Sequence, residues 1–230
     1  MSIKPRASSR APAEDDAGSR RPTKVLERER IAASIRMGTP VSDRLFDRFM
    51  AREARSASVH YWTSLAAAVR AGEWLDEVGA HTVLDIGSGA GKFCVAAALA
   101  SKVRFVGIEH RARLVTAARE LARQFEVEAR VAFIHGALEA VARVEADVYY
   151  LYNPFGENLF EPSHQLDADV ELGDVRYLRD VAFTEQLLQE AAEGTYVITY
   201  SGFGGLVPRS YREIRVDWTL SSILRMWKKS

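Results

Sequence analysis

The stretch Val83-Leu84-Asp85-Ile86-Gly87-Ser88-Gly89-Ala90-Gly91-Lys92-Phe93 decides the fold class of this chain of 230 residues. A short apolar run ends near an acidic residue, three glycines follow at alternate positions, and an alanine-rich segment comes next. Glycine lacks a Cβ, so the backbone can turn tightly there and a ligand can approach it closely. The helix expected after the loop presents free N–H groups and a positive dipole end to that ligand. The stretch therefore predicts a strand, a ligand-binding loop and a helix.

Strand-like and helix-like segments alternate along the chain beyond this loop. We expect strands over residues 82–86, 103–108, 131–134, 147–152 and 195–200, and helices over 92–101, 112–125 and 175–192. The end reads as two further strands, 211–218 and 222–227, whose short connection is typical of an antiparallel hairpin at a sheet edge. This order predicts an α/β fold, a doubly wound seven-stranded and mostly parallel sheet with an antiparallel C-terminal strand.

The region before the first strand has a different character. Residues 41–55 and 60–78 look helical, and in the second segment apolar side chains recur at helical spacing. This predicts an N-terminal helical cap over 31–78 in front of a core over 79–230. Residues 1–30 are rich in Arg, Ser, Ala and Pro and have almost no large apolar side chain before Val25. Such a segment buries too little surface to offset its ordering entropy, so we expect a disordered tail, either inert or serving as an RNA- or protein-docking arm.

The composition excludes several functional classes. Lysine plus arginine total 31, and aspartate plus glutamate also total 31, so no global charge draws the chain to nucleic acid or membrane. Cys94 is the one cysteine, which excludes an intramolecular disulfide and predicts a reducing, cytoplasmic compartment. No apolar run approaches the roughly 20 residues of a membrane-spanning helix. No group of residues has metal-ligand spacing, so we expect no metal site.

Three classes of ligand bind to glycine loops of this kind. A nucleotide phosphate loop requires Gly at position 86 and Ser or Thr at 93, where this chain has Ile86 and Phe93. A dinucleotide loop requires its third glycine at position 92, where Lys92 stands, so an NAD-dependent oxidoreductase is the less favoured alternative. The third ligand is S-adenosylmethionine. The run from Asp85 to Gly91 resembles the first motif of the class I S-adenosylmethionine-dependent methyltransferases.

This resemblance implies a set of residues around the cofactor. The glycines would pass under its methionine part, Asp85 would lie near its ammonium group, and Tyr61 and Thr63 near its carboxylate. Glu109 ends the second strand, and a carboxylate there can accept both ribose hydroxyls, although the dinucleotide fold also places an acid at this position. The cofactor-binding residues so predicted are Tyr61, Thr63, Asp85, Gly87, Ser88, Gly89, Gly91, Glu109, His110, Gly136, Ala137 and Asn153, with His110 flanking the adenine and the loop of Gly136 and Ala137 beside it.

The fourth strand leads into Asn153-Pro154-Phe155, and residues just past strand ends line the ligand crevice of such sheets. This tripeptide is similar to the Asn-Pro-Pro-Tyr motif of amino-methylating enzymes and to the Asn-containing loop of Dot1-like lysine methyltransferases. In those enzymes the Asn carbonyl and a backbone carbonyl accept hydrogen bonds from the target nitrogen. Phe155 and Gly156 replace the second proline and the aromatic residue, so a nucleic-acid base is not favoured as the acceptor. The structural alternative for Asn-Pro is an ordinary strand-to-turn stop.

These residues define the predicted chemistry. A sulfonium is already an activated electrophile, so alignment does most of the work. The predicted catalytic residues are Asn153, which would fix the nucleophile, and Glu157, which would take its proton directly or through water. The segment 156–175 carries six acidic residues and would attract a cationic or amine-bearing acceptor, or is simply a solvated loop. We therefore predict methylation of a nitrogen or oxygen nucleophile on a small molecule or protein side chain, with S-adenosylhomocysteine as the product. A non-catalytic cofactor-binding module of the same fold is the alternative.

Overall fold

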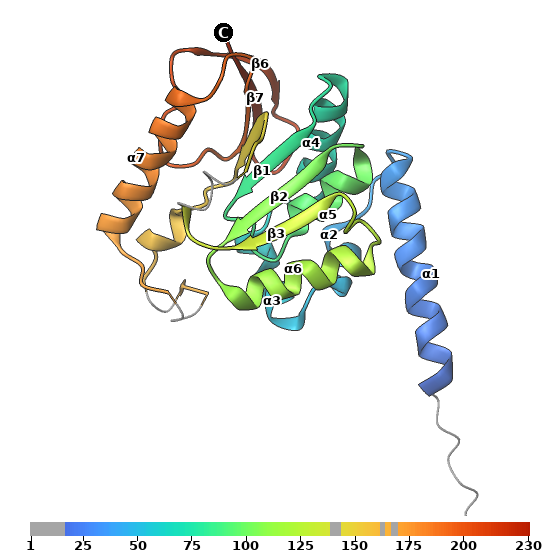
Figure 1. Ribbon diagram of the computed structural model, residues 1–230. Helices are drawn as coiled ribbons and strands as arrows, with labels where there is room; N and C mark the ends of the chain where they lie inside the picture. The colour runs from blue at the N-terminus through green and yellow to red at the C-terminus, as the bar shows by residue number, and fades with distance from the viewer. Residues whose placement is uncertain (1–16, 139–143, 162–163, 167–169) are drawn as a thin grey trace, which may run out of the picture.

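The computed structural model describes residues 17–138, 144–161, 164–166 and 170–230 (Figure 1). Within these residues seven strands form one sheet in the order β3-β2-β1-β4-β5-β7-β6. Their bounds are β1 Thr82–Ile86, β2 Arg104–Glu109, β3 Val131–His135, β4 Val148–Leu151, β5 Tyr196–Tyr200, β6 Tyr211–Asp217 and β7 Leu224–Lys229. The strands β1 to β5 pair in parallel, while β7 lies antiparallel between β5 and β6. The predicted sheet is thereby confirmed, including its antiparallel C-terminal hairpin.

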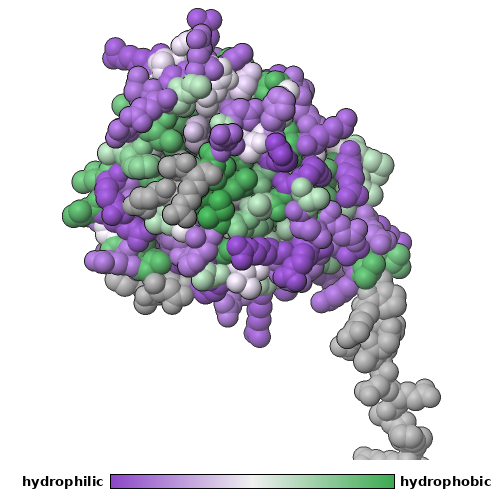
Figure 2. Space-filling view, in the orientation of Figure 1, coloured by the Kyte–Doolittle hydropathy of each residue, from purple (hydrophilic) through white to green (hydrophobic). Residues whose placement is uncertain are grey.

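Helices cover both faces of the sheet, so alternate residues of each strand enter different cores. Val83 packs in the core shared with the helices α4 (Leu65–Glu77), α5 (Lys92–Ala100) and α6 (Ala112–Gln124), whereas its neighbour Leu84 packs in the core shared with α7 (Asp174–Glu190). Figure 1 shows α7 on one side of the sheet and α5 and α6 on the other. Because both faces are buried, the central strands read as continuous apolar runs. Polar side chains cover most of the visible surface, and apolar ones gather near its middle (Figure 2).

The N-terminal region is more ordered than its composition suggests. Helix α1 spans Ala17–Arg36, so the expectation of a disordered tail up to residue 30 is wrong over residues 17–30; residues 1–16 lie outside the described part of the chain. Ile31, Ala32 and Ile35 are buried in the main core and anchor the end of this helix. An anchored turn propagates readily through the helix-forming residues that precede it, and those residues extend away from the body of the molecule (Figure 1).

Three short helices connect α1 to α4. They are α2 (Asp43–Phe46), the 3₁₀ helix η1 (Asp47–Phe49) and α3 (Arg52–Tyr61), so the single helix expected over residues 41–55 is divided. The backbone becomes extended at Met50 and Ala51, and the buried side chains of Phe46 and Met50 pack in the main core on either side of η1. None of the helices in the described residues is long and apolar enough to cross a bilayer.

Candidate active site

A crevice runs along the carboxyl edge of the sheet, with a cavity volume of about 110 Å³. Gly87, Glu109, Gly136 and Asn153 line it, and each comes from the end of a different strand among β1, β2, β3 and β4. Parallel strands bring their carboxyl ends to one edge of the sheet, which explains why motifs distant in sequence meet there. Ala137 lines the same crevice beside Gly136.

The glycine loop between β1 and α5 has the backbone that its sequence predicts. Gly87, Gly89 and Gly91 have φ of +76°, +54° and +78°, a region that other residues rarely adopt. Protein nevertheless occupies the space that their missing side chains leave. A Cβ at Gly87 would stand 2.9 Å from the Cβ of Pro154, and one at Gly89 would overlap the indole of Trp62. The indole of Trp62 therefore covers Gly89 in this structure.

Two further residues of the loop face inward. A Cβ at Gly91 would stand 2.6 Å from the ring of Phe133, so this glycine allows the loop to pack on β3. The Ser88 hydroxyl points back toward β2, where a Cβ at Gly107 would stand 2.5 Å from its oxygen. That hydroxyl is buried and has no hydrogen-bond partner among the described residues. The side chain of Ser88 thus packs against the second strand rather than into the main crevice.

Asp85 is a buried carboxylate without a cation beside it. The Cys94 thiol donates a hydrogen bond to its Oδ2 over 3.2 Å, and among the described residues it has no ion pair. Burial raises the pKa of Asp85 to about 7, against the opposing effect of the Cys94 hydrogen bond. Lys92 is close in sequence, but its ammonium is paired with Asp43 and Asp47. Asp85 therefore offers an unmatched carboxylate to a ligand that carries an ammonium group, which fits the methionine end of S-adenosylmethionine.

Glu109 connects the end of β2 to the glycine loop. The backbone N–H of Gly89 donates to its Oε2 over 3.1 Å, and the backbone N–H of Arg111 donates to its Oε1 over 2.8 Å. Burial raises the pKa of Glu109 above its usual range, while these two amides act in the opposite direction. Each carboxylate oxygen has a second lone pair, so both can still accept a ribose hydroxyl.

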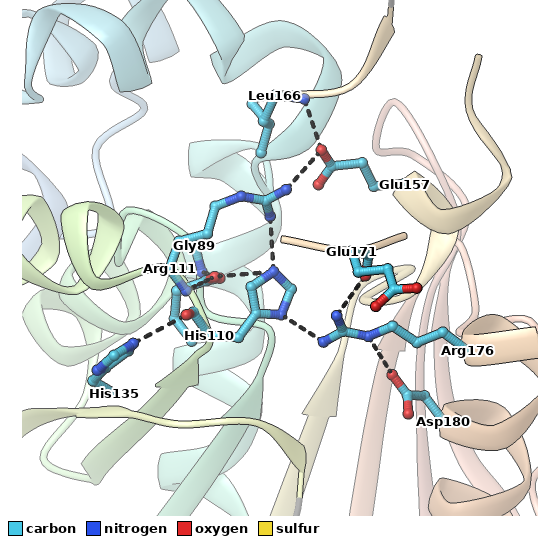
Figure 3. A network of polar contacts seen from close by, with 10 residues as sticks. Gly89, His110, Arg111, His135, Glu157, Leu166, Glu171, Arg176 and Asp180 are labelled. Atoms are coloured by element: carbon cyan, nitrogen blue, oxygen red, sulfur yellow. Dashed lines mark hydrogen bonds and ion pairs between the residues drawn. The ribbon is translucent and has the colours of Figure 1, made fainter. Parts of the chain in front are cut away.

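Arg111 is a site residue that the sequence analysis missed. Its guanidinium is buried, and it donates through Nη2 to Oε1 of Glu157 over 2.9 Å (Figure 3). Its Nη1 lies 3.0 Å from Nε2 of His110, and Nη2 of Arg176, from α7, lies 3.4 Å from Nδ1 of the same ring. Burial, followed by the charges of Arg111 and Arg176, lowers the pKa of His110 to about 4. His110 is therefore a neutral imidazole at the crevice wall near pH 7.

Glu157 joins the segment after β4 to the end of β2. Besides the guanidinium of Arg111, its Oε1 accepts a hydrogen bond from the backbone N–H of Leu166 over 2.7 Å. The predicted proton acceptor is thus an ion-paired carboxylate with one oxygen already engaged twice. Its position in the linear sequence gave no sign of this, because Arg111 and Glu157 belong to motifs of different strands.

Asn153 occupies a strained turn at the end of β4. Its φ is +39°, its backbone N–H donates to the carbonyl of Gly202 over 2.8 Å, and its exposed side chain packs against the bare Cα of Gly156. The side-chain amide has no hydrogen-bond partner among the described residues and lines the crevice. Strained positions of this kind persist where the surrounding structure holds them, and they cluster at functional sites.

The opposite wall includes Tyr61, which ends α3, and the next two residues, Trp62 and Thr63. The Tyr61 hydroxyl donates to the carbonyl of His164, and the Thr63 hydroxyl is buried 2.7 Å from the hydroxyl of Tyr150. All three residues line a small cavity of about 20 Å³ beside Asp85. Some residues that line this cavity also line the crevice. Trp62 also lines the crevice itself, and it is not among the site residues predicted from the sequence. The described residues contain no cluster suited to a metal ion.

Comparison with known proteins agrees with this geometry. Residues 78–155, about a third of the chain, match the family described as "Methyltransferase domain". The fold is similar to that of an O-methyltransferase from Bacillus cereus in complex with SAH, with a TM-score of 0.57 and 12% identity over 89% of this chain and 100% of the other. It is also similar to a putative O-methyltransferase from Klebsiella pneumoniae, with a TM-score of 0.56 and 12% identity over 89% of this chain and 99% of the other. No curated protein sequence matches the chain. Residues 78–155 are therefore similar in sequence to a methyltransferase domain, and the chain shares the fold of these two solved structures.

Proposed function

We propose that this chain transfers a methyl group from S-adenosylmethionine to a nitrogen nucleophile, with an oxygen nucleophile as the second candidate. One observation carries the proposal. At the carboxyl edge of the sheet, Asp85, a buried carboxylate without a cation, lines the small cavity. Glu109, a second carboxylate, and Asn153, whose amide has no hydrogen-bond partner among the described residues, line the crevice that adjoins this cavity. No single one of these residues would suffice, since acids at strand ends are common in α/β folds.

Different residues of the site bind different parts of the cofactor. Asp85 pairs with the ammonium group. The hydroxyl of Thr63 lines the same small cavity for the carboxylate, whereas the Tyr61 hydroxyl can donate to that carboxylate only after it leaves the carbonyl of His164. Glu109 accepts the ribose hydroxyls, and the neutral ring of His110 with the backbone of Gly136 and Ala137 borders the adenine. When bound, S-adenosylmethionine supplies a methyl group on a sulfonium, which needs alignment more than acid or base assistance.

Asn153 is placed to hold the nucleophile. Its side-chain carbonyl accepts a hydrogen bond from the target N–H, and this contact directs the nitrogen lone pair toward the methyl carbon. The N–C bond forms as the C–S bond breaks, and the sulfur keeps the electron pair of that bond. The extra proton on nitrogen leaves to water or to the free oxygen of Glu157. The likeness to the amino-methylating motif supports this role for Asn153.

The cofactor requires Trp62 to move. A volume of about 110 Å³ is well below the roughly 300 Å³ at which small-molecule pockets begin. Trp62 lies against Gly89 and lines both the crevice and the small cavity beside Asp85. Displacement of this one indole opens the glycine loop and joins the two cavities, so we expect cofactor binding to change the fluorescence of Trp62.

Titration with S-adenosylhomocysteine and with NAD tests the proposal. We expect calorimetric binding of S-adenosylhomocysteine alone, weakened at least tenfold by Asp85→Asn and by Glu109→Gln and unchanged in the surface control Glu193→Gln. Binding of NAD in its place would overturn the proposal in favour of an oxidoreductase. A methylation assay with labelled cofactor on metabolite mixtures and cell lysate then separates an enzyme from a non-catalytic module, since Asn153→Ala should abolish incorporation while leaving S-adenosylhomocysteine bound.

A further inference from the structure

A second and much larger cavity lies on the other side of Trp62. Its volume is about 1030 Å³, and its walls come from α3, from the start of α6 and from the segment after β4. We call it the outer groove. Five residues line both the outer groove and the crevice: Tyr61, Trp62, Leu114, Phe160 and Leu166. The two spaces therefore adjoin along these residues, and we expect the displacement of Trp62 that admits the cofactor to bring the groove next to it.

The groove has an aromatic wall. The ring of Tyr61 lies between those of Trp62 and Phe160, with centroid distances of 6.0 Å to each. Phe160 is 40% exposed, and the adjacent Leu159 is 53% exposed. Large apolar side chains gathered in a concave, exposed surface commonly mark a binding site. The faces of aromatic rings also attract cations through their quadrupole.

The charges of the groove favour a cation as well. Glu53 lies 3.7 Å from Arg113 and balances it, whereas Glu161 has no ion-pair partner among the described residues. Two further donors of the groove are engaged within the protein: the Ser56 hydroxyl donates to the carbonyl of Glu53, and the Gln165 amide donates to that of Phe160.

The hydroxyl of Tyr61 also donates its hydrogen bond within the protein, to the carbonyl of His164. The remaining polar side chain is the imidazole of His164, which can accept a hydrogen bond as readily as donate one. An anion would find few free donors here, while an ammonium group would find the carboxylate of Glu161 and three ring faces.

We infer that the outer groove binds the methyl acceptor, and that this acceptor is an amine attached to an aromatic or extended apolar body. The inference rests on the proposed function and names its substrate class. The groove binds the ammonium form of the amine. This form must lose one proton to water before the nitrogen lone pair attacks the methyl carbon. The aromatic wall then also suits the methylated product, which regains a positive charge on nitrogen.

Three probes of similar size test which charge the groove prefers in its ligand. Phenethylamine, 2-phenylethanol and 3-phenylpropionate share a phenyl ring and differ in charge, and each is titrated calorimetrically into the full chain with and without S-adenosylhomocysteine. We expect phenethylamine to bind at least tenfold more tightly than 3-phenylpropionate, with 2-phenylethanol between them. Equal binding of the three probes, or tighter binding of the carboxylate, would overturn the inference.

Variants locate the binding. Phe160→Ala and Glu161→Gln should each weaken phenethylamine at least fivefold, whereas Trp218→Ala, an exposed aromatic on the hairpin side, and Glu193→Gln should leave it unchanged. Both groove positions are exposed, so these variants should retain the thermal stability of the parent chain. The S-adenosylhomocysteine affinity of Glu161→Gln separates the two proposals. If S-adenosylhomocysteine binds but the affinity for phenethylamine is unchanged in the Phe160 and Glu161 variants, only the assignment of the outer groove is wrong. If S-adenosylhomocysteine itself does not bind, the proposed function is wrong.

Discussion

Asp85 shows how one buried carboxyl group links stability to ligand binding. Its pKa is raised to about 7 in the folded chain, whereas an exposed aspartate titrates near 3.9. Between these two values the unfolded chain has lost the proton that the folded chain retains. Stability contributed by this group is therefore present below about pH 4 and decreases as the pH rises to about 7. A bound ammonium group reverses this preference, because it favours the ionised carboxylate.

We expect Asp85→Asn to flatten the pH dependence of stability. The difference in unfolding free energy between this variant and the parent, measured by urea denaturation from pH 4.5 to 8, should change steadily in favour of the variant as the pH rises. The affinity of the parent for S-adenosylhomocysteine should increase as the pH rises through about 7, and that of the variant should not. A constant stability difference across this range would show that Asp85 titrates normally in the folded chain.

Gly89 combines a strained backbone with a crowded side. Gly89→Ala should destabilise the chain by about 2–3 kcal/mol in thermal or chemical unfolding, because alanine disfavours its φ of +54° and its methyl group meets Trp62. Gly79→Ala is the matched control. Gly79 has φ of +68° with nothing within 4 Å of its absent Cβ, so this change reports backbone strain alone, about 1 kcal/mol.

The part of this destabilisation that comes from the clash with Trp62 can be measured separately. In a Trp62→Ala background, Gly89→Ala should be no more harmful than Gly79→Ala, since the indole is gone. A Gly89→Ala penalty that is the same with and without Trp62 would mean that the two residues do not touch.

Helix α5 is fixed to the N-terminal helices through its first residue. The ammonium of Lys92 is almost completely buried and lies 2.5 Å from Oδ1 of Asp43 in α2, 2.8 Å from Oδ1 of Asp47 in η1 and 3.0 Å from Oγ of Ser58 in α3. Asp43 also accepts a hydrogen bond from the backbone N–H of Leu65, the first residue of α4. Lys92, which directly follows the glycine loop, thus contacts three helices directly and a fourth through Asp43.

We expect Lys92→Met to destabilise the chain by about 3–5 kcal/mol, because it leaves two carboxylates near a buried site without their cation. Urea denaturation measures this, and S-adenosylhomocysteine affinity should fall with it as the loop loses its support. Arg70→Ala is the control, since the pairs of Arg70 with Glu73 and Asp217 lie nearer the surface and are worth about 1 kcal/mol or less. Equal effects of the two changes would contradict a special role for the buried lysine.

Helix α1 packs into the core of the molecule through its last two turns. Ile31, Ala32 and Ile35 are buried, while Val25 and Leu26 are largely exposed. Deletion of residues 1–24 should leave the melting temperature within about 2 °C of the parent. Deletion of residues 1–36 removes two buried isoleucines, worth about 3–6 kcal/mol, and should lower it by on the order of 10 °C. Calorimetric melting checks both, and a small effect of the longer deletion would mean that α1 is not part of the core.

The sheet and its carboxyl edge could be predicted from the sequence because both depend on local patterns. Apolar runs such as Thr82–Ile86 specify strands buried on both faces, glycines specify the turn that follows, and the alternation of strands and helices specifies a parallel order. The positions of Asp85, Glu109 and Asn153 follow from this, since each comes at the end of a strand. The short hairpin connection near the C-terminus likewise indicated the antiparallel strand.

Only the tertiary structure decided which side chains meet across that edge. The pairs of Arg111 with Glu157 and of Lys92 with Asp43 join segments far apart in the chain, and the indole of Trp62 reaches Gly89 from a different helix junction. No periodicity encodes such pairings, because they depend on how helices from the N-terminal region pack over the loop. The sequence by itself determined the framework and the ends of its strands, through hydrophobic spacing and glycine. The size of the crevice, the wall that closes it and the groove beyond it were decided by packing between distant elements.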